Sequence, residues 1–293
     1  MADQSNQEEK HEDVVYSSGK AYGPAKTGSE PQTDEGIILH ALFEHERALK
    51  HYESIIEKEP ENGDAWYNKG LTLYALNRFY EAMDAFDMAA AFNPKDSDAY
   101  YNKGVIQAEL GFLNDAVGNF DKAYEADHEN VDALYNKASA YLKLEKFEEA
   151  VQIYEGLIEK NNKNFEAAHN KALAEVQMGK YEDALRSFDL VIQIDPSNKE
   201  AWYDKGHLLL KISQTQDAKE AFNMALKLIA DLPGNWFRIG GIFAVIGEKQ
   251  KALEYLQKSI AADEEMRAWA VEDIDYESLW EDSDFKKIIA APV

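Results

Sequence analysis

The chain has 293 residues, contains no cysteine and carries a formal net charge of −24 at pH 7. Without cysteine it can form neither disulfides nor thiolate metal sites. The strong negative charge disfavours nonspecific binding to nucleic acid and to anionic membranes, because both require clustered Lys and Arg. No apolar run approaches the ~20 residues of a membrane-spanning helix, and the first residues lack the apolar core of a signal peptide. We therefore expect a cytoplasmic protein that binds neither nucleic acid nor membranes.

The segment 1–28 is polar, rich in Gly, Ser, Lys and Glu, and shows no helical periodicity. Such a composition cannot bury enough apolar surface to offset the entropy that is lost on ordering. We predict a disordered acidic or polar tail, which could also fold onto the groove of the repeats that follow it.

A regular period governs the chain from residue 29 onward. The stretch AWYNKG at 65–70 returns in related forms at 99–104, 133–138 and 167–172, and as AWYDKG at 201–206. These stretches recur every ~34 residues, and a fixed period of this length indicates an array of repeated structural units. The predicted units are 29–62, 63–96, 97–130, 131–164, 165–198, 199–232 and 233–266.

Small and aromatic residues recur at fixed places within each unit. Position 8 is Gly or Ala, position 20 is Ala in every unit, and position 24 is aromatic in all but the last. Small residues allow two helices to approach closely, and the aromatic ring fills the space beside them. Three units are closed by proline just beyond the second helix, where its missing N–H does little harm. Each unit is therefore predicted to be an antiparallel helix pair.

This pattern resembles the tetratricopeptide repeat (TPR) family over residues 29–266. The second unit carries the signature residues best: Trp66, Gly70, Leu73, Ala82, Phe86, Ala89 and Pro94. The resemblance implies an all-α fold, a right-handed superhelical solenoid of antiparallel helix pairs, and the units are similar to the archaeal or bacterial type. Three units depart from the pattern: the first has Gln32 where Trp or Tyr is expected, the sixth lacks the closing proline, and the seventh has Gly240-Gly241 inside a helix.

The segment 267–293 breaks the period. Its apolar residues are spaced as in short helices, and they include Trp269, Ala270, Leu279, Trp280, Phe285, Ile288 and Ile289. The last helix pair of a solenoid needs a cover, because it otherwise exposes an apolar face. The segment resembles the closing element found after some prokaryotic TPR arrays. We predict C-terminal capping helices in which Trp269 and Trp280 are buried.

Positions 2, 5, 6, 9, 12 and 13 of the first helix face away from the packing positions 4, 7, 8 and 11, because a helix advances about 100° per residue. In TPR proteins these positions line the concave inner wall. The candidate peptide-binding residues are at position 6, Asn68, Asn102, Asn136, Asn170 and Asp204; at position 5, Tyr67, Tyr101, Tyr135, His169 and Tyr203; and at position 2, Asp98, Asp132 and Glu166.

The chemistry of these rows suits an extended peptide that is basic or neutral. An Asn amide both donates and accepts hydrogen bonds, so a ladder of Asn can hold a peptide main chain. Aromatic rings offer flat apolar area and cation–π faces, and acidic side chains attract Lys and Arg. A similar Asn ladder lines the groove of the TPR enzyme that adds N-acetylglucosamine to proteins. A structural origin is the alternative, since Asn is common at position 6, acids favour helix starts and Tyr can pack between helices.

The position-7 lysines stand where the family usually has Leu or Ile. A Lys stem can pack its methylenes at the edge of the interface and place its ammonium at the rim. We predict a packing role, with neighbouring acids neutralising the charge. These lysines are Lys69, Lys103, Lys137, Lys171 and Lys205.

The sequence contains neither a phosphate-binding GxxxxGK[ST] loop nor a dinucleotide-binding GxGxxG motif, and its histidines lack metal-site spacing. We therefore expect no cofactor, no metal and no enzymatic activity. The resemblance implies a protein–protein interaction scaffold whose partner is a protein or peptide. Two alternatives remain: an assembly protein that self-associates into a homo-oligomer through its end repeats or convex face, and a regulatory subunit of an enzyme.

Overall fold

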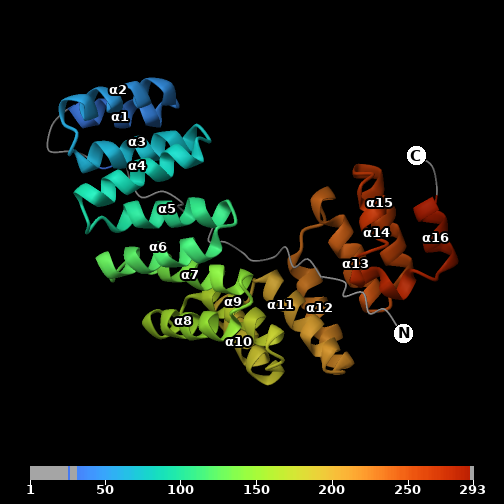
Figure 1. Ribbon diagram of the computed structural model, residues 1–293. Coiled ribbons are helices and arrows are strands. Elements are labelled where there is room, and N and C mark those ends of the chain that lie inside the picture. The colour runs from blue at the N-terminus through green and yellow to red at the C-terminus, as the bar shows by residue number, and fades with distance from the viewer. Residues whose placement is uncertain (1–25, 27–31, 291–293) are drawn as a thin grey trace, which may run out of the picture. The chain divides into compact units, whose positions relative to one another are not determined.

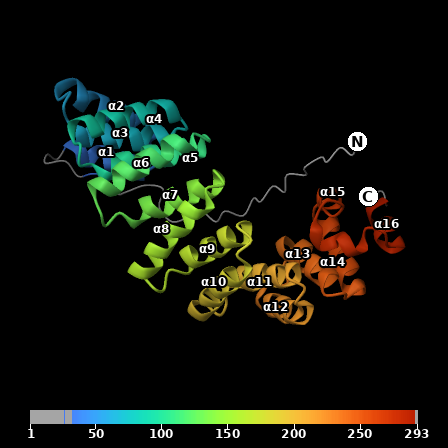
Figure 2. The same cartoon turned by 60° about the horizontal axis from the view of Figure 1, so that its bottom comes forward.

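The computed structural model describes residue 26 and residues 32–290, and almost all of these lie in helices joined by short loops (Figures 1 and 2). Within that part of the chain no strand is present. The predicted all-α fold of antiparallel helix pairs is confirmed. The tail predicted over 1–28 lies outside the described residues, apart from Lys26.

The contacts divide the chain into two compact units, Met1–Met178 and Gly179–Val293, which are described separately. The N-terminal unit contains α1 Gln32–Ala41, α2 His45–Lys58, α3 Gly63–Ala75, α4 Phe79–Phe92, α5 Ser97–Glu109, α6 Leu113–Ala126, α7 Val131–Lys143, α8 Phe147–Lys160 and α9 Phe165–Gln177. The C-terminal unit contains α10 Tyr181–Ile194, α11 Lys199–Lys211, α12 Thr215–Leu228, η1 Pro233–Asn235, α13 Trp236–Val245, α14 Lys249–Ala262, α15 Met266–Trp269, η2 Ile274–Leu279 and α16 Ser283–Ala290.

Each of the helices α3, α5, α7, α9 and α11 begins with the same cap. The side chain before the helix accepts a hydrogen bond from the backbone N–H of an alanine three residues later, as Asn62 does from Ala65 at 3.0 Å. Such a cap satisfies one of the backbone donors that a helix start leaves free. The capping residue is Asn in four of the five helices and Asp96 in α5.

The turn between the two helices of each pair requires a left-handed residue at position 15. The backbone φ there lies between 58° and 87° in every repeat. A residue in this conformation just after a helix closes the helix end. The residues at this position are Phe43, Asn77, Gly111, Glu145, Gly179, Ser213 and Gly247.

Replacing Ser213 with Gly should stabilise the C-terminal unit by about 0.5–1 kcal/mol, because Gly adopts a positive φ without a Cβ penalty. Ser213 is exposed and has φ 64°, so the substitution removes no packed side chain. The reverse change, Gly111→Ser, meets no atom within 4 Å and should destabilise the N-terminal unit by a similar amount. Chemical denaturation checks both, and changes of the same sign would contradict the prediction.

The core forms where small residues meet aromatic rings. The alanines at position 20 are fully buried. A Cβ added to Gly104 would lie 2.8 Å from Phe120 Cε1, and one added to Gly70 would lie 2.7 Å from Phe86 Cε1. These separations are below normal contact distance, so the close packing of each helix pair depends on the missing side chain.

The position-7 lysines form a second regular feature. Each pairs with an acid on the second helix of the preceding pair, at N–O distances of 2.5–3.3 Å. The pairs are Lys69 with Glu53, Lys103 with Asp87, Lys137 with Asp121, Lys171 with Glu155, and Lys205 with Asp189. The prediction that neighbouring acids neutralise the position-7 lysines is confirmed. These ion pairs connect successive helix pairs.

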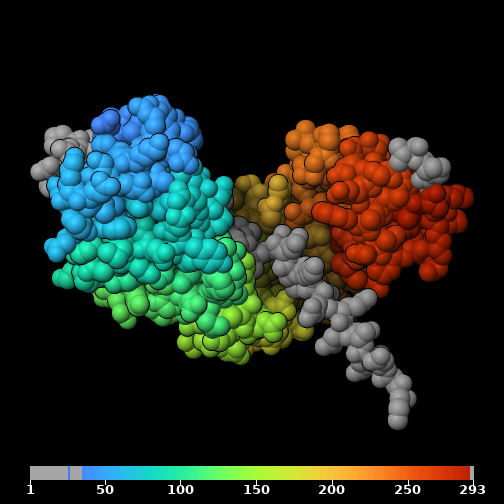
Figure 3. All heavy atoms as spheres, turned by 45° about the horizontal axis from the view of Figure 1, so that its top comes forward, coloured from blue at the N-terminus to red at the C-terminus, as the bar shows by residue number. Residues whose placement is uncertain are grey.

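Three short helices, α15, η2 and α16, pack against α13 and α14 of the last repeat, and together they are referred to below as the C-terminal cap. In the space-filling view they form one continuous body with those helices (Figure 3). Tyr276 of η2 is fully buried, and its hydroxyl donates to the Phe237 carbonyl at 2.7 Å. It lies against Gly240, where an added Cβ would be 2.4 Å from the hydroxyl oxygen. Because position 24 of this repeat is Leu256, Tyr276 takes the place of the aromatic ring.

The prediction that Trp269 is buried is wrong, since this residue is 57% exposed. Tyr276 and Phe285 already occupy the space over the last pair. Trp280 packs at the edge of the same cluster, half-buried, and its Nε1 donates to the Ala270 carbonyl at 3.0 Å.

Candidate functional site

In the N-terminal unit the tyrosines at position 5 and the asparagines at position 6 form one connected row. In the third to fifth repeats the Asn Nδ2 donates to the hydroxyl of the Tyr in the preceding repeat. The bonds run from Asn102 to Tyr67 at 3.1 Å, from Asn136 to Tyr101 at 2.9 Å and from Asn170 to Tyr135 at 2.6 Å. We refer to these six residues as the tyrosine–asparagine row.

The three tyrosine rings of the row are buried, with exposures of 0–6%. Burial raises the pKa of each, to about 12 for Tyr101, so the phenols remain neutral. Their hydroxyls orient the asparagine amides from one repeat to the next. The tyrosines are therefore positioning residues, and the Tyr67 ring also lies against the Lys26 ammonium.

Asn68, which comes just before the row, holds the main chain of Lys26. The Lys26 backbone N–H donates to Asn68 Oδ1 at 3.0 Å, and Asn68 Nδ2 donates back to the Lys26 carbonyl at 2.9 Å. The amide thus satisfies both backbone groups of one residue. This contact involves no side-chain atom of Lys26, so any extended residue except proline could make it.

The side chain of Lys26 enters an acidic pocket beside Asn68. Its ammonium pairs with the Asp96 carboxylate and lies 3.9 Å from Asp98 Oδ2. It also lies 4.5 Å from the centroid of the Tyr67 ring, which is cation–π distance. Burial raises the pKa of Asp98, while the nearby Lys26 charge lowers it.

Two asparagines of the row, Asn102 and Asn170, present a side-chain oxygen that has no partner among the described residues. Among the residues that the structure describes, none donates to Asn102 Oδ1 or Asn170 Oδ1. These residues are only 2% and 1% exposed. An unpaired buried acceptor is unfavourable by about 1–3 kcal/mol. Both oxygens occupy the repeat position at which Asn68 accepts the Lys26 N–H.

The remaining predicted residues of the N-terminal unit differ in exposure. Asp98 and Glu166 are half-buried, Asp132 is exposed and His169 is buried. The Glu166 charge adds to the burial that raises the pKa of Tyr135. The acidic row therefore includes both half-buried and exposed side chains along the same helices.

In the C-terminal unit the predicted Tyr203 does not line an open wall. Its hydroxyl donates to Asp275 Oδ2 at 2.6 Å. Asp275 belongs to η2 of the C-terminal cap and is only 4% exposed. His207 Nε2 lies 3.0 Å from Asp275 Oδ1, and Arg238 stacks over the Tyr203 ring at 4.1 Å. Asp204 is half-buried nearby on α11. The cap thus occupies positions that the sequence suggested for a ligand.

The sequence analysis did not identify Asp275 as a partner of Tyr203 and His207, although one feature of the sequence indicates a close neighbour there. Gly241 stands at position 9, where other repeats have larger residues, and a Cβ there would lie 2.9 Å from Asp275 Cβ. The second glycine of the Gly240-Gly241 pair therefore makes room for the cap.

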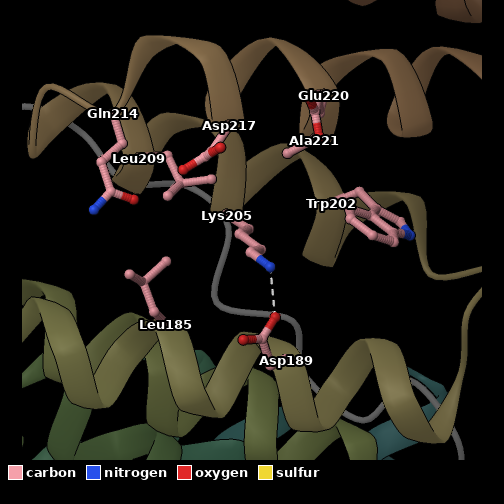
Figure 4. A pocket seen from close by; sticks show the side chains of 9 residues that line it. All are labelled: Leu185, Asp189, Trp202, Lys205, Leu209, Gln214, Asp217, Glu220 and Ala221. Carbon is pink, nitrogen blue, oxygen red and sulfur yellow. Dashed lines mark hydrogen bonds and ion pairs between the residues drawn. The ribbon is translucent and has the colours of Figure 1, made fainter.

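A cleft of about 360 Å³ lies between α10, α11 and α12. Figure 4 shows the Lys205–Asp189 ion pair crossing it, between Leu185 on one side and Trp202 on the other. Its α11 residues, Trp202, Lys205 and Leu209, stand at packing positions 4, 7 and 11 and not at the predicted wall positions. The ion pair is one of the repeat-to-repeat pairs described above.

Within residues 26 and 32–290, no three His, Cys, Asp or Glu side chains are grouped as metal ligands. None of the helices described is both long and apolar enough to cross a membrane.

Comparison with protein families matches three segments of the chain. Two match tetratricopeptide repeat models, over residues 41–97 and 175–233. The third, over 109–191, matches the model of anaphase-promoting complex, cyclosome, subunit 3. A search of curated proteins finds no match.

Several solved structures share the fold. The C-terminal part of a TPR repeat-containing protein from Cytophaga hutchinsonii is 16% identical, the match covers 79% of this chain and 95% of that part, and the TM-score is 0.65. A TPR protein from Parabacteroides merdae is 18% identical, covers 81% and 95%, and has a TM-score of 0.61. YrrB, described as a TPR protein with an unusual peptide-binding site, is 24% identical, covers 61% and 93%, and has a TM-score of 0.54.

Proposed function

We propose that this chain, which is a tetratricopeptide repeat protein, holds an extended segment of a partner protein along the asparagines of its N-terminal unit. The TPR fold supports a protein–protein interaction scaffold, and such repeats are generally not enzymes. YrrB, with the same fold, is described as having a peptide-binding site.

The observation that carries the proposal is the paired hydrogen bond between Asn68 and the Lys26 main chain. It is the contact by which an Asn side chain recognises a peptide independently of its sequence. The unpartnered Oδ1 atoms of Asn102 and Asn170 offer the same acceptor at the same repeat position, within the described residues. A peptide N–H at each would satisfy a buried polar group.

The tyrosines supply the rigidity that such a site needs. Each asparagine from the third repeat to the fifth is held by a tyrosine hydroxyl of the preceding repeat. An amide that is already oriented loses less conformational entropy when it binds. The acidic side chains on the same helices favour a basic or neutral segment over an acidic one.

The test uses the full chain carrying Lys26→Pro, which removes the N–H that occupies Asn68. A fluorescent peptide with the sequence YGPAKTGSE, residues 22–30 of this chain, should bind it in an anisotropy titration. Methylating the backbone nitrogen of the peptide lysine should weaken binding about tenfold or more, because Asn68 Oδ1 is left buried and unpaired. Asn68→Ala in the protein should weaken it similarly.

The matched control is Asn223→Ala, which removes an exposed asparagine of α12 outside the row and should leave the affinity unchanged. Circular dichroism shows whether each variant is folded. The proposal is overturned if backbone methylation and Asn68→Ala both leave the affinity unchanged. Absence of binding at about 1 mM peptide would overturn it as well.

A further inference from the structure

We infer that Asp96, Asp98 and Tyr67 form a subsite for a lysine side chain, and that Lys26 of this chain is its tethered occupant. This inference rests on the proposed function and adds a side-chain preference to main-chain capture. A partner would be recognised by an extended segment whose lysine takes the place of Lys26 at Asn68, and it would have to displace Lys26.

The strongest support is the identity of the α5 cap. The equivalent caps of α3, α7, α9 and α11 are all Asn, and each accepts the same backbone hydrogen bond. Asn and Asp cap helices about equally well. Capping therefore does not require the negative charge of Asp96, and the charge faces the Lys26 ammonium.

Burial makes this charge effective. Asp96 is 3% exposed, and among the described residues its Oδ2 has no hydrogen-bond partner. An ion pair with a buried carboxylate is screened less by water and salt than one on the surface. The unpartnered oxygen is a free acceptor for a second hydrogen bond from an ammonium group, which has three donors.

The other walls of the subsite also suit a lysine. The Tyr67 ring lies 4.5 Å from the ammonium nitrogen, and its hydroxyl is already engaged by Asn102. The ring therefore presents its face to a cation. Asp98 adds a second negative charge at 3.9 Å from the ammonium. A neutral side chain of the same length would gain none of these interactions.

Because Lys26 belongs to the same chain as the subsite, it competes with a partner peptide for binding there. A tethered segment competes at an effective concentration that is typically millimolar for a short flexible linker. Lys26 precedes Gln32, the first residue of α1 in the same folded unit, by 6 residues in the sequence. A free peptide should therefore bind wild-type protein more weakly than the Lys26→Pro variant.

The experiment compares YGPAKTGSE with the same peptide in which norleucine replaces lysine. With the Lys26→Pro chain, the lysine peptide should bind about tenfold more tightly, as expected for a hydrogen-bonded ion pair. Asp96→Asn keeps the helix cap and removes the charge, so it should reduce the lysine preference to about twofold or less. Wild-type protein should bind the lysine peptide several-fold more weakly than Lys26→Pro.

The control for general electrostatics is Asp84→Asn, which removes one charge at an exposed position of α4 and should preserve the lysine preference. Equal affinity for the lysine and norleucine peptides, with Asn68→Ala still weakening both, overturns the lysine subsite and leaves main-chain capture intact. Equal affinity of wild type and Lys26→Pro overturns the tethered occupant. Loss of the lysine preference in Asp84→Asn would assign it to net charge instead.

Discussion

Tyr276→Ala is expected to destabilise the C-terminal unit by about 3–5 kcal/mol, the cost of removing a large buried aromatic ring. Tyr276 is fully buried between the cap and α13, and it stands where the earlier repeats place their own aromatic residue. Without the ring, the small residues of the last repeat face a cavity. Hydrogen exchange should rise in α13 and α14 and remain unchanged in α3 to α9.

Two further variants separate packing from hydrogen bonding at this position. Tyr276→Phe keeps the ring and loses only the bond to the Phe237 carbonyl, so it should be less stable by about 1 kcal/mol. Trp269→Ala removes an aromatic residue of the cap that is 57% exposed and should change stability by less than about 0.5 kcal/mol. If Trp269→Ala were as destabilising as Tyr276→Ala, the account of the cap would be wrong.

Asp275→Ala should destabilise the C-terminal unit by about 3 kcal/mol near pH 6, because it leaves His207 and the Tyr203 hydroxyl without a buried partner. Asp275→Asn keeps an acceptor for Tyr203 and removes only the charge, so its effect should be smaller. Thermal or chemical unfolding followed by tryptophan fluorescence measures both. If both variants lost the same amount of stability, the charge of Asp275 and not its hydrogen bond to Tyr203 would account for the effect.

The interaction between His207 and Asp275 also makes the stability of the C-terminal unit depend on pH. Burial lowers the pKa of His207, but the carboxylate of Asp275, with smaller effects of Asp204 and Asp273, raises it above its ordinary value overall. A histidine whose folded pKa is raised contributes stability below its unfolded pKa of about 6.5, and this contribution is lost as pH rises through the folded pKa. The rings of Tyr203 and Phe222 also lie against the His207 ring.

The measurement is the difference in unfolding free energy between wild type and His207→Gln from pH 5 to pH 9, which cancels the titration of distant groups. Wild type should be the more stable by about 1–2 kcal/mol at the acidic end, and the difference should shrink toward the alkaline end. A difference that grew with pH would contradict the assignment of the ion pair.

These interactions assign the candidate site to the N-terminal unit. In the C-terminal unit Asp275 of the C-terminal cap contacts the side chains of Tyr203 and His207, which stand at wall positions 5 and 9. In the N-terminal unit the wall holds an asparagine that contacts a main chain. The same repeat sequence thus serves a cap in one unit and a candidate peptide site in the other.

Periodicity was sufficient for the architecture because the determinants of a helix pair are local. The alanines of position 20, the small residues of position 8 and the caps before the first helices recur at fixed spacing, so each repeat specifies its own fold. The position-7 lysines were also interpretable from sequence, since a Lys stem at the edge of a packing stripe needs an acid near its tip. Only the partner acid, on the second helix of the preceding pair, was not identified.

The roles of the wall residues depended on contacts between residues that are far apart in the chain. Sequence placed Tyr67 and Asn102 on the same wall, but only the fold shows that one orients the other across 35 residues. It is likewise the fold that brings Lys26 to Asn68 and Asp275 to Tyr203, 42 and 72 residues apart. A repeat pattern determines which face a side chain occupies, because that follows from helical geometry. What covers that face is decided by segments outside the repeats, and their position follows from packing and charge in three dimensions.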